Sequence, residues 1–135
     1  MSMLDALGFP AEQADAVLIT LDKLDKIGVD GVLAELRERG MPEAAVAALA
    51  EVPALRAAAA GDSATAAVSD AAIRASLPAG VDEQAIADLA AIAAAVGEAV
   101  PLAFDPFLVR GMGYYTGPIF EVAHPELGYS LGGGG

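Results

Sequence analysis

Apolar residues recur at helical spacing through most of the first hundred positions of the chain. From Ala11 to Ile27 they return every three or four residues with aspartates between them, as on one face of a helix. Similar patterns, bounded by Asp, Ser, Gly or Pro, predict further helices over 31–39, 43–51, 55–60, 62–77 and 82–100. Gly28 and Pro53 are expected to end helices. Most of the chain is therefore expected to be an alanine-rich helical region.

The pattern changes after Pro101 to short apolar runs bounded by Gly and Pro. The runs that predict strands cover 107–109, 119–123 and 129–131. The last two are expected to pair antiparallel through a turn that holds His124. The expected fold class is α+β, with the helical region followed by two or three antiparallel strands. The expected division is a lead-in and first helix (1–28), a helical region (29–101) and a partial sheet (102–135).

Composition and charge exclude several classes of protein. Seven basic against 19 acidic side chains give a formal net charge of −12, which repels polyanions and argues against a free-standing nucleic-acid binder. The absence of cysteine and the single histidine exclude a disulfide framework and a zinc centre. Charges, Pro or Gly interrupt the apolar stretches before the roughly 20 residues of a membrane span. A cytoplasmic protein without membrane contact is expected.

The segment from Phe104 to Glu121 carries the candidate chemistry. Arg110 follows a predicted strand, and its planar guanidinium suits a carboxylate or phosphate. Two interpretations stay open here: an anion-binding arginine, or a plain hairpin in which Arg110 pairs with a structural carboxylate. Asp105 is predicted to be a turn residue, and the second possibility is that it is the carboxylate that pairs with Arg110. His124 is expected to be an exposed turn residue and not a base.

Residues 108–121, LVRGMGYYTGPIFE, resemble the signature of the histidyl-tRNA synthetases, Leu-Val-Arg-Gly-Leu-Asp-Tyr-Tyr-Thr-Gly-Thr-Val-Phe-Glu, at ten of its fourteen positions. Two further landmarks come in the family's order. SLGGGG at 130–135 resembles its glycine-rich strand, and LDKLDKIG at 21–28 resembles the segment ahead of its helical insertion. Gly113 and Pro118 depart from the signature, because the family usually has Asp and Thr there.

The resemblance implies that the chain is a piece of a class II aminoacyl-tRNA synthetase and contains part of its catalytic sheet. The parent enzyme would join histidine to tRNA at the expense of ATP. The resemblance also implies that Arg110 contacts the α-phosphate and is catalytic. The residues implied to bind histidine are Tyr114, Tyr115, Gly133 and Gly134. No metal ligand is assigned. The parent enzyme would use ATP and Mg²⁺, act on histidine and tRNA(His), and form a homodimer.

The resemblance covers roughly the middle third of such an enzyme, and the final glycines are expected to continue into further core residues. The 135 residues alone are therefore expected to be inactive and to need no cofactor. Two alternatives stay open: a regulatory subunit of ATP phosphoribosyltransferase, which resembles the synthetases, and a non-catalytic structural fragment. Lys23 and Lys26 are expected to complement a helix dipole, with a tRNA contact as the second possibility.

Overall fold

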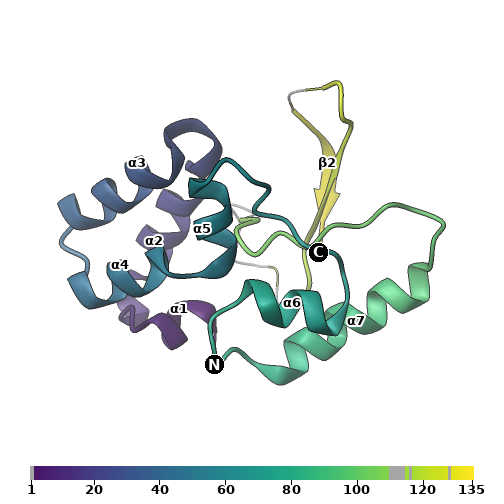
Figure 1. Ribbon diagram of the computed structural model, residues 1–135, viewed down its shortest axis with the longest axis horizontal. Coiled ribbons are helices and arrows are strands. Elements are labelled where there is room, and N and C mark those ends of the chain that lie inside the picture. The colour runs from purple at the N-terminus through teal and green to yellow at the C-terminus, as the bar shows by residue number, and fades with distance from the viewer. Residues whose placement is uncertain (1, 110–114, 116, 128) are drawn as a thin grey trace.

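The computed structural model describes residues 2–109, 115, 117–127 and 129–135. Within these ranges the elements are α1 (Met3–Leu7), the 3-10 helix η1 (Ala11–Gln13), α2 (Ala14–Leu21), α3 (Leu24–Glu38), α4 (Glu43–Ala50), α5 (Pro53–Ala59), α6 (Asp70–Ser76), α7 (Glu83–Val96), β1 (Phe120–Ala123) and β2 (Ser130–Gly134). Figure 1 shows α1 to α5 gathered on one side, α6 and α7 together on the other, and the strand pair projecting between them. The predicted α+β class is confirmed.

Helices α1 to α5 pack around one apolar core. Its fully enclosed side chains come from four of these helices and include Val17, Leu36, Leu49 and Leu55. Helix α3 lies at the centre, because it contacts α2, α4 and α5. Burial of these branched side chains is the main stabilising contribution, since alanine elsewhere removes little apolar area from water.

The predicted helix over 11–27 is wrong in its length. Helix α2 ends at Leu21, and backbone N–H groups of Asp22 and Lys23 close its last turn on Leu18 and Thr20. The chain then turns, so that α3 packs back against α2. Gly28 breaks the helical geometry as predicted, at φ 71° and ψ 177°, but the break is a kink within α3. Periodicity could not anticipate the turn, because apolar spacing continues through it.

Pro53 also has a different place from the one predicted. It occupies the first turn of α5, where a missing backbone N–H leaves no helical hydrogen bond unmade. Helix α4 ends at Ala50, close to the predicted end, and Glu51 and Val52 link the two helices. The proline therefore begins a helix as well as following one.

The predicted helix over 62–77 is only half correct. Helix α6 starts at Asp70, where the Ser69 hydroxyl accepts a hydrogen bond from the Ala72 N–H at 3.3 Å. Ahead of it the chain is irregular, with bends on both sides of Ala66, which forms an isolated antiparallel bridge with Phe104. A tertiary partner thus takes the backbone hydrogen bonds that a helix would have used.

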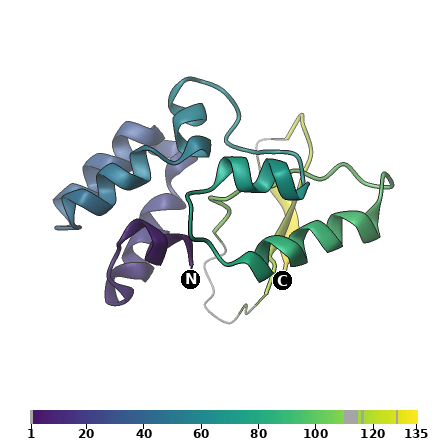
Figure 2. The same ribbon diagram turned by 60° about the horizontal axis from the view of Figure 1, so that its bottom comes forward.

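Helices α6 and α7 form a hairpin that contacts α5 through α6, and Figure 2 shows the two helices side by side. Ile73 and Ile86 are its buried apolar side chains. Asp82 caps α7 as predicted by accepting a hydrogen bond from the Gln84 N–H at 2.8 Å. The helix ends at Val96, earlier than the predicted residue 100, because Gly97 adopts a positive φ of 62°.

Strands β1 and β2 pair antiparallel, which confirms the two strands predicted around 119–123 and 129–131. The register sets Phe120 opposite Gly134 and Glu121 opposite Gly133, with an irregularity after Val122. The predicted strand over 107–109 is wrong, because these residues leave a turn and pair with no strand in the described part of the chain. Nowhere in those same ranges is a helix both long and apolar enough to cross a membrane.

Candidate functional site

The segment predicted to carry the chemistry is only partly described by the structure. Arg110, Gly113 and Tyr114 lie outside the described residues, and so does the proposed pairing of Arg110 with Asp105. Tyr115, Gly133 and Gly134 lie within them. The described part of the candidate site therefore consists of residues 105–109, which lead to Arg110, of Tyr115, and of the glycine strand β2.

Tyr115 is half-buried and lies against the end of β2. A Cβ atom added to Gly135 would come within 2.6 Å of the Tyr115 Cδ1 atom and 3.0 Å of the Ile119 Cγ2 atom. Neither separation leaves room for a methyl group, so the ring packs directly on the Gly135 backbone. Two histidine-binding candidates, Gly133 and Gly134, directly precede that contact.

The glycines of β2 differ in what surrounds them. A Cβ added to Gly134 would meet the Phe120 ring at 3.2 Å, whereas one added to Gly132 would meet nothing within 4 Å. Sequence reasoning missed Gly135 as a site residue, although the glycine run signalled that some backbone approaches closely there. The Tyr115 ring packs on Gly135, so Gly135 is the glycine at which this ring leaves no room for a side chain.

A cavity of about 280 Å³ lies between the α2–α3 turn and the strand pair. Carboxylates from three parts of the chain line it, namely Asp22, Asp25, Asp105 and Glu121. Burial raises the pKa of Asp105, the hydrogen bond from the Phe107 N–H lowers it, and the negative charges of Asp25 and Glu121 raise it further. The net result is a pKa above the usual value. Asp22 and Asp25 were predicted only as polar positions of a helix, because nothing in their spacing indicates a partner a hundred residues away.

Asp105 is a turn residue, as predicted. Its Oδ1 atom accepts a hydrogen bond from the Phe107 N–H at 2.9 Å, and its carbonyl accepts one from the Leu108 N–H at 3.3 Å. This local bonding turns the Phe107 side chain into the apolar core, where only 6% of it is exposed. The residues leading to Arg110 are thus fixed on the helical side of the molecule.

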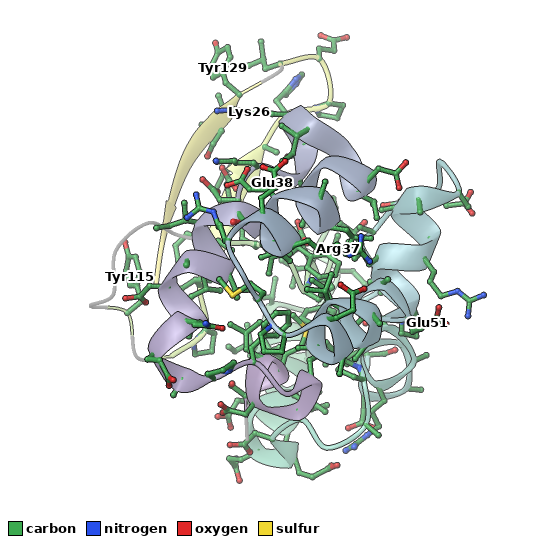
Figure 3. All side chains as sticks on the ribbon, turned by 90° about the vertical axis from the view of Figure 1, so that its left-hand side faces the viewer. Lys26, Arg37, Glu38, Glu51, Tyr115 and Tyr129 are labelled. Atoms are coloured by element: carbon green, nitrogen blue, oxygen red, sulfur yellow. The ribbon has the colours of Figure 1, made fainter. Side chains whose placement is uncertain are left out.

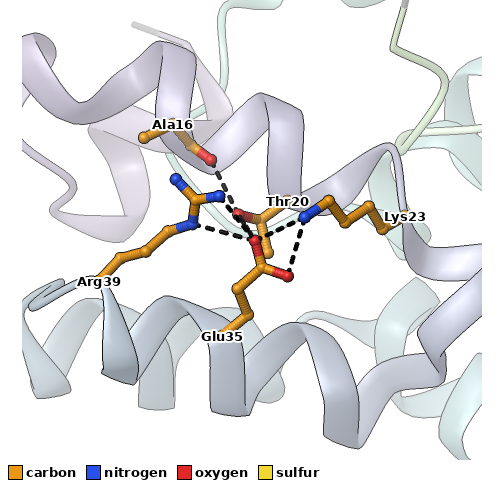
Figure 4. Close-up of polar contacts among 5 residues, drawn as sticks. All are labelled: Ala16, Thr20, Lys23, Glu35 and Arg39. Atoms are coloured by element: carbon orange, nitrogen blue, oxygen red, sulfur yellow. Dashed lines mark hydrogen bonds and ion pairs between the residues drawn. The ribbon is translucent and has the colours of Figure 1, made fainter.

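The cations of the helical region are largely engaged by neighbouring carboxylates. Glu35 receives hydrogen bonds from Lys23 Nζ at 2.8 Å and from the Arg39 guanidinium at 2.8 Å (Figure 4). The hydrogen bonds from Lys23, then those from Arg39, lower the pKa of Glu35. The Thr20 hydroxyl lies 3.4 Å from the same carboxylate and donates to the Ala16 carbonyl at 2.9 Å. Lys23 therefore forms an ion pair with Glu35 that links the α2–α3 turn to α3.

The remaining helical arginines are paired in the same way. The four pairs are Arg37 with Glu43, Arg56 with Glu51, and Arg74 with both Asp70 and Glu83. Arg37 and Arg39 are partly exposed and ion-paired. Within the described ranges Lys26 has no ion pair, and Figure 3 shows it far from Tyr115. A tRNA contact by Lys26 would therefore lie away from the candidate histidine site.

His124 lies exposed in the turn after β1, as predicted. Its Nδ1 atom accepts a hydrogen bond from the Glu126 N–H at 3.2 Å, which is a local turn contact. Over the described stretches, no group of three or more His, Cys, Asp or Glu side chains is arranged to hold a metal ion.

Along its whole length the chain is similar to aminoacyl-tRNA synthetases. It belongs to the histidyl-tRNA synthetase family, because the family model described as "Histidyl-tRNA synthetase" matches residues 1–135. The resemblance carried by the signature and the glycine strand is thereby confirmed for the chain as a whole.

Three relatives illustrate the similarity. A histidine–tRNA ligase of Leifsonia xyli subsp. xyli is 50% identical over 137 residues, which cover 99% of this chain and 31% of that protein. A probable histidine–tRNA ligase of Tropheryma whipplei (strain Twist) is 42% identical, covering 99% of this chain and 32% of its own length. Histidine–tRNA ligase 1 of Bacillus cereus is 30% identical, covering 98% of this chain and 30% of its own length. The chain thus spans about a third of the length of these relatives, and no solved structure matches it significantly.

Proposed function

We propose that the protein containing this chain activates histidine with ATP and transfers it to tRNA(His), in the cytoplasm and as a homodimer. The observation that carries the proposal is the family match over residues 1–135, supported by relatives named as histidine–tRNA ligases, one of them 50% identical. The chain would contribute part of the catalytic sheet and the helical region in front of it. The division into 1–28, 29–101 and 102–135 belongs to this proposal.

The first reaction joins a histidine carboxylate oxygen to the α-phosphorus of ATP and breaks the bond to pyrophosphate, which leaves. Negative charge grows on the α-phosphate oxygens in the transition state, and Arg110 would stabilise it with its permanent positive charge. A tRNA hydroxyl then attacks the histidyl carbonyl carbon, and AMP leaves. Mg²⁺ bound to the phosphates would neutralise part of their charge.

Histidine would be held by Tyr114, Tyr115, Gly133 and Gly134. The contact of the Tyr115 ring with Gly135 supports this assignment, because it brings one tyrosine candidate to the end of the strand that carries both glycine candidates. Most residues of β1 and β2 are exposed, and within the described residues the sheet has two strands, which suits a strand pair that the rest of a larger sheet covers. Gly113 leaves the family's usual carboxylate absent from this segment.

The experiment is ATP–pyrophosphate exchange with histidine, followed by tRNA(His) charging, using the complete gene product. Replacing Arg110 with Ala is expected to lower the exchange rate by about 100-fold or more, as for loss of one transition-state donor. Arg74→Ala is the matched control, because Arg74 pairs with Asp70 on the α6–α7 hairpin. Exchange that survives Arg110→Ala unchanged would remove the assigned role.

The regulatory-subunit alternative predicts a different outcome. A protein of that kind would copurify with a phosphoribosyltransferase subunit and charge no tRNA. The ligase names of the relatives, which match the helical region and the strands alike, favour the synthetase. The 135 residues alone are expected to give no exchange, because the remaining phosphate-binding groups of a synthetase would be missing.

A further inference from the structure

The chain just ahead of Arg110 is held by contacts outside the strand pair. Phe104 exchanges two backbone hydrogen bonds with Ala66, one from the Phe104 N–H at 2.7 Å and one from the Ala66 N–H at 2.8 Å. One residue later, Asp105 caps the turn through its bond to the Phe107 N–H at 2.9 Å. These bonds fix the direction in which the chain leaves Phe104.

Phe107 then enters the core of the helical region. It is the one member of the buried cluster that comes from beyond α5 in the described part of the chain. Leu21 and Leu24, at the α2–α3 turn, line the same cavity as Phe107. Val109, the residue bonded to Arg110, is half-buried and packs on the same core. The residues just before Arg110 therefore pack against the core of α1 to α5. Tyr115, which follows Arg110 in the chain, packs instead against the end of the glycine strand β2.

We infer that Phe107 is a positioning residue for the reaction, anchoring the signature segment in the helical core so that Arg110 starts from a fixed point. The inference rests on the proposed function. Val109 is bonded directly to Arg110, so a shift of the anchored backbone at Val109 would displace the point from which the Arg110 side chain extends. A misplacement of about 1 Å at a reacting group can lower a rate by about 100-fold. The helical region would thereby affect catalysis without touching the substrates.

The test compares two mild core substitutions in the complete gene product. Phe107→Leu loosens the anchor, whereas Leu49→Val loosens the same core at α4, which packs against α1, α3 and α5. Both are expected to lower the Tm by similar amounts. Only Phe107→Leu is expected to lower kcat of ATP–pyrophosphate exchange, by about tenfold, with the KM for histidine changed less than about twofold, because a displaced Arg110 acts mainly on the transition state.

A second readout does not depend on activity. Trypsin cleaves after arginine, so the rate of cleavage after Arg110 reports how firmly that bond is held. Phe107→Leu is expected to raise this rate several-fold over the wild type, and Leu49→Val is not. The Asp105 turn is tested in the same way: Asp105→Ala should act like Phe107→Leu, and Asp105→Asn, which retains the acceptor, should restore the wild-type rate.

The outcomes separate the inference from the proposed function. If both core variants lose kcat in proportion to their loss of Tm, or if neither loses any, Phe107 has a structural role only and the inference is overturned. If the wild type shows no exchange, the proposed function fails. In that case trypsin would still test whether Phe107 anchors the segment. Equal rates of cleavage after Arg110 in the two core variants would show that it does not, and a faster rate in Phe107→Leu alone would show that it does.

Discussion

The ring of Tyr115 packs on the backbone of Gly135, close enough that a Cβ atom at Gly135 would lie 2.6 Å from Cδ1 of the ring. Real Cβ atoms do not approach other atoms that closely, so any larger residue must displace the ring or the strand. The contact joins two of the family landmarks, the tyrosine pair and the glycine strand. It gives Gly135 a specific steric reason to be a glycine.

Gly135→Ala is therefore expected to displace Tyr115 and weaken histidine binding. Overpacking of this kind costs about 1–3 kcal/mol, so the KM for histidine in ATP–pyrophosphate exchange should rise about 5-fold to 100-fold. Gly132→Ala is the matched control, because the added methyl group meets nothing within 4 Å. Equal effects of the two substitutions would show that the glycines matter only through backbone freedom.

Asp105→Asn is expected to stabilise the chain at neutral pH. Burial is the main cause that raises the pKa of Asp105, with Asp25 and Glu121 adding to it, so the folded state binds its proton more tightly than the unfolded chain does. Stability therefore falls as pH rises through the window between the unfolded value and the raised pKa, and the ionised carboxylate remains unfavourable above it. Asparagine retains the acceptor for the Phe107 N–H without the charge.

The measurement is Tm against pH for both proteins. The variant should have the higher Tm at pH 7, and the two curves should approach each other as the pH falls below the unfolded pKa of about 4. A wild type more stable than Asp105→Asn at pH 7 would mean that the carboxylate has a favourable partner that outweighs its burial.

Glu35→Gln is expected to have the opposite pH signature. The pKa of Glu35 is lowered by Lys23 first and by Arg39 second, so its contribution to stability is present above the unfolded value and is lost as pH falls through the folded one. The variant should have a lower Tm than the wild type at pH 7, and the difference should vanish in acid. Since 22% of the Glu35 side chain is exposed, 1 M salt should also shrink the difference. Glu51→Gln, at the more exposed pair with Arg56, is the control and should change the Tm little.

Leu36→Ala is expected to destabilise the helical region by about 2–5 kcal/mol, because Leu36, in the last turn of α3, is fully enclosed. Urea denaturation followed by circular dichroism measures the loss. Ile92→Ala, on the exposed face of α7, should change the free energy of unfolding by no more than about 0.5 kcal/mol. Similar losses for both would mean that α7 is covered by another part of the complete protein.

The family and the order of the elements could be predicted from the sequence because they depend on local signals. The 108–121 signature, the glycine run, the cap at Asp82 and the helical periodicities of α3, α4 and α7 all lie within short stretches. Local signals also predicted the strand pair and the exposed His124 turn. They failed where a distant partner decides the conformation: Ala66 is extended because Phe104 bonds to it, and Phe107 is a core residue in a turn and not a strand.

By itself, the sequence determined which residues are apolar, which can cap or break a helix, and which motif the chain shares with its family. Only the tertiary structure decided that Phe107 belongs to the helical core, that Gly135 receives the Tyr115 ring, and that Asp105 faces Asp25 and Glu121. The physical reason is that these relationships arise from packing and charge between segments far apart in the chain. Their energies depend on distances that no local pattern records.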